Sequence, residues 1–220
     1  MIQFINVSKS YDTDIILKDI SFTIEKGELA FVTGPSGVGK TTLLRLIYCA
    51  ERPDEGDIIT AGWDLRKLKQ STIPFLRRNV GIVFQDFRLL LNKTVFENVA
   101  LALRIHDMHP KEIKEHVNGV LKEVRLKHKE NVFPHHLSGG EQQRVVIARA
   151  MVSKPTVLLA DEPTGNLDSE TSKAIMNLFR GINTKGTTVL IATHNDSLFQ
   201  GTGRRVLHLS DGQIEKEFIG

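Results

Sequence analysis

Cysteine is almost absent from this sequence, since Cys49 is the single cysteine among 220 residues. No disulfide can form within the chain, so we expect a reducing compartment, the cytoplasm. A free cysteine usually packs as a small hydrophobic residue. We therefore expect Cys49 to be a buried, unreactive thiol within an apolar helix, TTLLRLIYCA, over 41–50.

Long apolar runs are also missing, because no stretch approaches the ~20 residues that a helix needs to cross a bilayer. The first residues, MIQFINVSKSYD, lack a basic segment followed by an apolar one, so they do not resemble a signal peptide. Dense basic patches with interleaved aromatic residues are absent as well, although the net charge is +3. We therefore expect no direct membrane span and no nucleic-acid binding.

The eight histidines do not form a pattern that is typical of a metal site. His135 and His136 are adjacent in the sequence, so we expect their side chains to diverge. Four others lie in a charged region that we expect to be exposed: His106, His109, His116 and His128. We therefore expect no metal site made of protein side chains alone.

Short β-type runs alternate with segments of helical periodicity, which predicts an α/β fold. Several runs are continuously apolar and rich in Val, Ile and Leu, as strands of a parallel sheet are when helices cover both faces. The predicted strands are IQFINV (2–7), ELAFVT (28–33), NVGIVF (79–84), TVLLAD (156–161) and TTVLIA (187–192).

Apolar residues at helical spacing predict amphipathic helices over 111–126 and 170–182. The segment from about 86 to 155 is mostly helical in its pattern, so we interpret it as a helical subdomain inserted into the α/β core. Near the C-terminus, RVLHLSDGQIEKEF predicts a hairpin that turns at Asp211 and Gly212. We expect the N-terminal run to pair with residues near 57–60 in a small antiparallel sheet.

One stretch carries a specific phosphate-binding pattern, because GPSGVGKT at 34–41 fits G-x-x-x-x-G-K-[ST] between a predicted strand and a predicted helix. Glycines let backbone amides approach phosphate groups, and the helix N-terminus adds partial positive charge. Lys40 can reach the β- and γ-phosphates, and the Thr41 hydroxyl can bind Mg²⁺. We expect the nucleotide to contact Gly34, Pro35, Ser36, Gly37, Val38, Gly39, Lys40, Thr41 and Thr42.

A second buried strand ends in two acids, Asp161 and Glu162, at the edge where ligands bind open α/β sheets. Asp161 is placed to hold Mg²⁺ through water, and Glu162 is placed to polarise a water for attack on the γ-phosphate. Because side chains alternate along a strand, we expect Glu162 to point away from Asp161. Gln85 and His194 also follow predicted strands toward this edge, and we expect His194 to contact the γ-phosphate.

The stretch LSGGEQQR, 137–144, has the features of an anion site although it contains no lysine. Ser138 can cap the helix that follows, and Gly139 and Gly140 leave backbone amides open. The stretch lies in the helical insertion, so it need not reach Lys40 of the same chain.

Seven features follow one another along the chain: Tyr11, GPSGVGKT, Gln85, LSGGEQQR, VLLADE, GNLD (165–168) and His194. In this order they resemble the motifs of the ATP-binding-cassette (ABC) ATPases. The resemblance implies a RecA-like P-loop NTPase core with an antiparallel β-subdomain at about 1–85 and 156–220, and a helical subdomain at about 86–155. It also implies ATP hydrolysis by a head-to-tail homodimer with two ATP molecules at its interface.

The resemblance further implies a role for each matched residue. Tyr11 stacks on adenine, and Mg²⁺ is held by Thr41, Gln85 and Asp161. Glu162 is the general base, and the residues that take part in catalysis are Lys40, Gln85, Glu162 and His194. We interpret LSGGEQ as a contact to the γ-phosphate of the ATP held by the other protomer, with binding residues Ser138, Gly139, Gly140, Gln142 and Asp168.

Within the family, spacing favours the separate ATPase subunit of a membrane complex. The segment between Gln85 and Leu137 is too short for the long coiled coil of chromosome-maintenance relatives, and one cysteine cannot supply the zinc sites of excision-repair relatives. The chain has a single cassette, whereas the translation-factor branch has two. The stretch GIVFQDFRLLLNKTVFENVALAL (81–103) is similar to the cell-division branch; lipoprotein-release and macrolide-export ATPases share LSGGEQQR and EPTGNLD and are the alternative.

In that branch the resemblance implies an integral membrane subunit that holds the protein at the cytoplasmic face of the inner membrane. The resemblance also implies that ATP cycling in this complex controls cell-wall hydrolysis outside the membrane. We expect the apolar run from Val83 to Leu103, which includes Phe84, Phe87 and Leu89 to Leu91, to form much of the docking surface. A soluble cassette that remodels nucleic acid or ribosomes, and a scaffold that binds ATP without turnover, are weaker alternatives.

Overall fold

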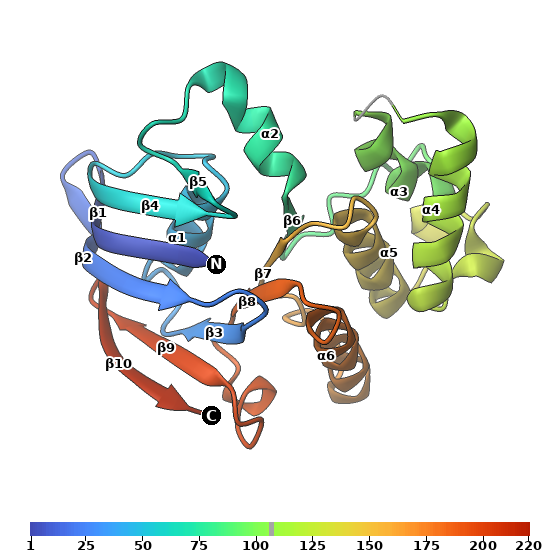
Figure 1. The fold of residues 1–220 in the computed structure, drawn as a ribbon. Coiled ribbons are helices and arrows are strands. Elements are labelled where there is room, and N and C mark those ends of the chain that lie inside the picture. The colour runs from blue at the N-terminus through green and yellow to red at the C-terminus, as the bar shows by residue number, and fades with distance from the viewer. Residues whose placement is uncertain (106–107) are drawn as a thin grey trace.

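The computed structural model describes residues 1–105 and 108–220, in which the strands form two sheets (Figure 1). The larger sheet has the order β10-β9-β3-β8-β7-β6. Its strands are β3 (Leu29–Thr33), β6 (Val80–Val83), β7 (Val157–Asp161), β8 (Thr188–Ala192), β9 (Arg205–Ser210) and β10 (Gln213–Ile219). All neighbours pair in parallel except β9 and β10, which form the predicted C-terminal hairpin.

The centre of this sheet confirms the expectation for continuously apolar runs. Every residue of β3 and β8 is buried, and so are the first four residues of β7. Helices on both faces remove these side chains from water, and that burial is the main favourable contribution to folding. Because these strands are parallel, their carboxyl ends meet at one edge of the sheet, where polar residues follow them.

The smaller sheet has the order β2-β1-β4-β5, with every pair antiparallel. Its strands are β1 (Ile2–Tyr11), β2 (Asp14–Ile24), β4 (Glu55–Thr60) and β5 (Trp63–Asp64). The pairing of β1 with residues 57–60 confirms the prediction, whereas β2 was not predicted. The rings of Phe4 and Phe22 stack across β1 and β2 with centroids 4.7 Å apart, in a core shared with α1 (Lys40–Ile47).

Three helices stand together beside the sheets: α3 (Val95–Arg104), α4 (Pro110–Glu123) and α5 (Gly139–Met151) (Figure 1). Another helix, α6 (Ser169–Asn183), packs against α5 and β8. Both predicted amphipathic helices are present, as α4 and α6. The remaining helical elements are α2 (Ile73–Arg78) and the 3₁₀ turns η1 (Gln70–Thr72), η2 (Lys127–Lys129), η3 (Pro134–His136) and η4 (Asp196–Leu198).

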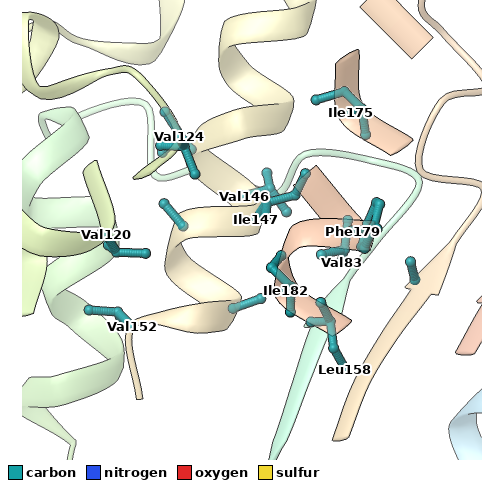
Figure 2. Close-up of a cluster of buried hydrophobic side chains, with 14 of the residues drawn as sticks. Val83, Val120, Val124, Val146, Ile147, Val152, Leu158, Ile175, Phe179 and Ile182 are labelled. Atoms are coloured by element: carbon teal, nitrogen blue, oxygen red, sulfur yellow. The ribbon is translucent and has the colours of Figure 1, made fainter. Parts of the chain in front are cut away.

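One apolar core joins these helices to the sheet, as Figure 2 shows. Val146 and Ile147 of α5 lie between α4 and α6 and are fully buried. Phe179 of α6 and Leu158 of β7 belong to the same cluster. Because close-packed side chains resist displacement, this core fixes the start of α5 relative to the sheet.

Two local expectations were wrong. Cys49 is buried but lies beyond the end of α1 at Ile47, in a turn where its φ is 56°. The rings of His135 and His136 do not diverge, since η3 holds their centroids 4.0 Å apart. His106, whose exposure was also predicted, lies outside the described residues. Within 1–105 and 108–220, none of the helices has the length and apolar character needed to cross a membrane.

Candidate active site

The phosphate-binding pattern forms the connection between β3 and α1, so its amides lie at the N-terminus of a helix. Gly34 has a φ of 143°, and a Cβ atom at this position would lie 2.2 Å from the carbonyl oxygen of Leu209. Gly39 has a φ of 107° and immediately precedes α1. Only glycine combines these backbone angles with such close packing at little cost, so the loop shape depends on both residues.

Lys40, the first residue of α1, has a side chain that is only 7% exposed. Its Nζ donates to the carbonyl oxygens of Gly34 at 2.7 Å and Pro35 at 2.9 Å. The Glu162 Oε1 atom lies 3.9 Å away. Burial lowers the pKa of Lys40, and the nearby carboxylates of Glu162 and Asp161 oppose that shift. These hydrogen bonds hold the ammonium group against the loop that is predicted to bind the phosphates.

Thr41 and Asp161 are in direct contact, because the Thr41 hydroxyl donates to Asp161 Oδ2 at 2.8 Å. Burial raises the pKa of Asp161, Thr41 opposes the shift through its hydrogen bond, and the charge of Glu162 adds to it. A cation at this position would relieve the buried negative charge. Hydroxyl, carboxylate and amide oxygens are the ligands that Mg²⁺ prefers, and Gln85 lines the same cavity.

Glu162 follows the last residue of β7 and has a φ of 44°, outside the extended region. This backbone angle ends the strand alternation, so the expectation that Glu162 points away from Asp161 was wrong. Both carboxylates line one cavity. Glu162 accepts a hydrogen bond from the Thr193 hydroxyl at 3.2 Å, and the His194 Nδ1 atom lies 2.8 Å from its Oε1.

The cavity at this edge of the sheet has a volume of about 250 Å³. It brings together ten of the predicted site residues: Ser36, Gly37, Gly39, Lys40, Thr41, Thr42, Gln85, Asp161, Glu162 and His194. They come from the loop before α1, from the first turn of α1 and from the segments that follow β6, β7 and β8. Thr193 was missed by the sequence argument, although its position directly after a buried strand was an available signal.

Other predicted residues do not line this cavity. The stretch from Ser138 to Gln142 opens α5, and Ser138 caps that helix as predicted. The Gln142 side chain turns back and donates to the Leu137 carbonyl at 3.2 Å. Asp168 caps α6 by accepting from the Thr171 amide at 2.8 Å.

Tyr11 also lies outside the cavity, at the end of β1. Its hydroxyl donates to the Glu51 carboxylate, and its ring is partly exposed. The Lys9 ammonium lies over the Tyr11 ring, 5.7 Å from its centroid. The contact of Tyr11 with adenine stays a prediction.

A comparison with protein families gives this arrangement a context. The sequence profile described as "ABC transporter" matches residues 17–165, which span the phosphate-binding loop, Asp161 and Glu162. The chain belongs to the ABC transporter family. It is an ATP-binding cassette and an ATPase of this family, and its fold is that of such a cassette.

Named relatives of this ABC ATPase are similar over nearly the whole chain. The cell division ATP-binding protein FtsE of Bacillus subtilis (strain 168) is 49% identical over 218 residues, which cover 99% of this chain and 96% of the relative. FtsE of Escherichia coli (strain K12) is 49% identical over 215 residues, 97% of both chains.

Solved structures agree in fold. The dimeric structure of MJ0796, a bacterial ABC transporter cassette, has a TM-score of 0.90 at 37% identity, covering 100% of this chain and 98% of that one. A post-hydrolysis state of MJ0796 bound to ADP and Pi has a TM-score of 0.90 at 36% identity, with the same coverage.

Proposed function

We propose that this ABC ATPase acts in cell division as the ATP-hydrolysing subunit of a membrane complex whose integral membrane subunit is FtsX. The observation that carries the proposal is that the side chains with predicted roles toward phosphate, metal and water line one cavity: Lys40, Thr41, Gln85, Asp161, Glu162 and His194. The 49% identity to proteins named FtsE, over nearly all of this chain, supports the role in division. In this role the chain lies at the cytoplasmic face of the inner membrane, held there by its partner.

The cavity fits the phosphates of ATP together with Mg²⁺. The loop amides and Lys40 bind the phosphates, and the ligands available to Mg²⁺ are Thr41, Gln85 and Asp161. When bound, Mg²⁺ neutralises charge on the β- and γ-phosphates. Thr41 and Asp161 are already in contact, so the chain holds two ligands on the same side of the cavity. Tyr11 supplies the face on which adenine stacks.

Glu162 acts as the general base that accepts a proton from the attacking water. Its hydrogen bonds with Thr193 and His194 fix the carboxylate at the cavity wall, which is the positioning that proton transfer requires. His194 is largely exposed, with 57% of its side chain accessible, so it can reach the γ-phosphate from the open side. Lys40 and Gln85 complete the catalytic set by contacting phosphate and metal.

Two protomers share each ATP in a head-to-tail homodimer. The amides at the start of α5 lie outside the chain's own phosphate cavity, which supports a contact with the ATP of the partner. The proposal assigns Ser138, Gly139, Gly140 and Gln142, at the start of α5, to that contact, and Asp168, the cap of α6, to the interface nearby. The similar cassette MJ0796 has been solved as a dimer.

The membrane subunit docks on the segment from Val83 to Leu103. Leu90 and Leu91 are 41% and 64% exposed there, although Leu89 is buried in the core. These leucines follow Gln85, a predicted Mg²⁺ ligand, by five and six residues in the connection between β6 and α3. Movement of Gln85 on ATP binding would therefore shift this segment and alter the docking surface.

Pull-down of the tagged protein from membranes of its native cell, with and without ATP, tests the proposal. Mass identification of a division-specific integral membrane subunit is the expected result. Recovery of the membrane subunits of a lipoprotein-release or macrolide-export system would instead support the alternative role. Recovery of ribosomes or nucleic acid without a membrane protein would contradict the proposal.

A further inference from the structure

The start of α5 contains an acidic residue beside the amides proposed to face the partner's ATP. Glu141 Oε2 accepts from the Ser138 amide at 3.0 Å, and Ser138 Oγ accepts from the Glu141 amide at 3.3 Å. This reciprocal capping box uses the first and fourth of the consecutive amides. The amides of Gly139 and Gly140 have no acceptor within the helix, so they are free for an anion.

The capping box has an electrostatic cost at this position. Glu141 places a full negative charge within one helical turn of amides that are to receive a γ-phosphate. Like charges at such a distance repel, and the repulsion is only partly screened because the Glu141 side chain is 22% exposed. Some other group must offset this charge for the amides to act as an anion site.

Lys129 is that group, because its Nζ donates to the second carboxylate oxygen, Glu141 Oε1. Lys129 belongs to η2, twelve residues before Glu141, and its own side chain is 30% exposed. Lys129 is the largest cause of the lowered pKa of Glu141, with the Ser138 amide contributing as well. The carboxylate is therefore kept ionised and is neutralised by its partner, not by a proton.

The segment that carries Lys129 is fixed to two other helices. The Leu126 amide donates to the Leu121 carbonyl of α4 at 2.8 Å, and Lys127 donates to Asn118 of the same helix at 2.7 Å. The Phe96 amide, at the start of α3, donates to the Glu130 carbonyl at 2.8 Å. Lys129 is thus held in place by contacts on both sides of it along the chain.

A lysine on a capping box is not by itself evidence for a role at a ligand. At α3, Thr94 and Glu97 form the same box, and Lys93 lies 3.2 Å from Glu97. That lysine comes from the same turn of chain, whereas Lys129 comes from a separate element. Glu141 also differs from Glu97 in its location, because it lies beside amides that are proposed to bind an anion.

We propose that Lys129 is a positioning residue of the shared ATP site: by neutralising Glu141 it lets the Gly139 and Gly140 amides accept the partner's γ-phosphate. The inference rests on the proposed head-to-tail dimer. It predicts that removing Lys129 harms the site chiefly through the exposed charge of Glu141. Removing that charge as well should then restore function.

The test measures ATP-driven dimerisation of the full chain by sedimentation velocity, in a Glu162→Gln background that is expected to slow turnover. Lys129→Gln should weaken dimerisation roughly tenfold, equivalent to about 1.4 kcal/mol, while binding of ATP to the monomer is unchanged. Adding Glu141→Gln to Lys129→Gln should restore dimerisation, and Lys129→Arg should retain it. Lys93→Gln is the matched control, because Lys93 pairs with Glu97 of the α3 capping box, which is not proposed to face a phosphate.

Each result has one meaning. Dimerisation of Lys129→Gln at the parental level would overturn the proposal, and so would a double variant as weak as Lys129→Gln, because that pattern indicates a merely structural contact. Ser138→Arg in the same background separates this inference from the proposed dimer. If Ser138→Arg dimerises normally with ATP, the proposed head-to-tail dimer is wrong. If Ser138→Arg fails to dimerise, the dimer proposal stands, and the Lys129 variants test only the role of Lys129.

Discussion

Glu162 is held at the cavity wall by two residues that follow β8. Thr193 donates to one carboxylate oxygen, and His194 lies 2.8 Å from the other. Lys40 lies 3.9 Å from the same oxygen that His194 contacts. A carboxylate that is fixed in this way is positioned to accept a proton from water, which is the role proposed for Glu162.

Glu162→Gln is expected to leave ATP binding intact and to slow hydrolysis by roughly 10²- to 10⁴-fold, because glutamine keeps the shape but cannot accept the proton. Single-turnover hydrolysis and equilibrium binding of a fluorescent ATP analogue measure the two steps. Ser197→Ala is a matched surface control, since Ser197 is exposed, lies in η4 shortly after β8, and donates hydrogen bonds from its amide and hydroxyl to Asn195. Near-normal turnover of Glu162→Gln would exclude Glu162 as the base.

Asp161→Asn is expected to change how stability depends on pH. Burial raises the pKa of Asp161 above its ordinary value of 3.8, so the folded chain holds this proton more tightly than the unfolded chain. Stability then falls as the pH rises from 3.8 through the raised pKa. The nucleotide-free variant, which keeps an acceptor for Thr41, should be more stable than the wild type at neutral pH.

Thermal unfolding across the acidic range checks this sign. The difference in stability between Asp161→Asn and the wild type should shrink as the pH is lowered toward 3.8, where the wild-type carboxyl is protonated. An unchanged difference across that range would mean that ionisation of Asp161 does not oppose folding.

Single residues of the site could be predicted from the sequence because each follows a recognisable apolar run. Asp161, Glu162 and His194 were found in this way. Their mutual contacts depend on the register of β7 against β8, in which Asp161 pairs with Ala192, and no local pattern specifies that register. The direction of Glu162 was mispredicted for the same kind of reason, since its φ of 44° is set by contacts beyond the strand.

Gly140 couples two helices at the element scale. A Cβ atom on Gly140 in α5 would lie 2.5 Å from the Cγ2 methyl of Thr171 in α6. That methyl cannot swing away freely, because the Thr171 hydroxyl donates to Asp168 at 2.6 Å. The glycine therefore serves close approach of the two helices as well as access to its amide.

Gly140→Ala is expected to destabilise the protein by roughly 1–3 kcal/mol, the usual range for an overpacked contact. Adding Thr171→Ser removes the methyl and keeps the hydroxyl, so it should recover most of the loss. Gly119→Ala in α4 is the matched control, because nothing lies within 4 Å of its Cβ position; it should stabilise by roughly 0.5–1 kcal/mol. Chemical denaturation gives all three values, and a neutral Gly140→Ala would contradict the contact.

The elements themselves were predicted where one pattern dominates locally. The apolar strands of the parallel sheet and the amphipathic α4 and α6 are of this kind. The strand β2 was missed because its sequence, DIILKDISFTI, mixes apolar and charged residues, and bulges interrupt its register with β1. Cys49 was placed in a helix because the run 41–50 is apolar, yet the chain leaves the helix after Ile47.

Over the whole molecule, the phosphate cavity and the start of α5 belong to different parts of the fold. Figure 1 shows α5 among the helices that stand beside the sheets, whereas α1 lies against the smaller sheet. A second copy of the chain is therefore the natural source of amides for the ATP bound at Lys40. Two defective protomers should then be able to complement each other.

Ser138→Arg is expected to abolish hydrolysis and to spare ATP binding, because the arginine side chain would fill the space of the partner's γ-phosphate. Lys40→Ala should also be inactive, through lost phosphate contacts. A mixture of the two variants should regain part of the turnover, since the mixed dimer contains one intact shared site. Ser138→Ala controls for loss of the helix cap, which costs about 1 kcal/mol of stability. A fully active monomer would contradict this arrangement.

Leu91→Asp tests where the membrane subunit docks. Leu91 is 64% exposed, so a charge there should leave folding and ATP binding unchanged while disrupting an apolar interface. Phe87 is a poorer probe, because its ring packs against the core and its carbonyl accepts from Arg149 at 3.0 Å. We expect Leu91→Asp to lose the membrane subunit in the pull-down from native membranes.

Ile219→Asp is the matched control for that prediction, since Ile219 is an aliphatic residue, 70% exposed, on β10 away from α3 (Figure 1). It should retain the membrane subunit. Leu91→Asp should also leave the ATPase activity of the isolated chain unchanged. Because the docking surface is proposed to respond to Gln85, the variant should lose any change in ATPase rate that the membrane subunit causes. Equal recovery of the membrane subunit with both variants would place the docking surface elsewhere on the cassette.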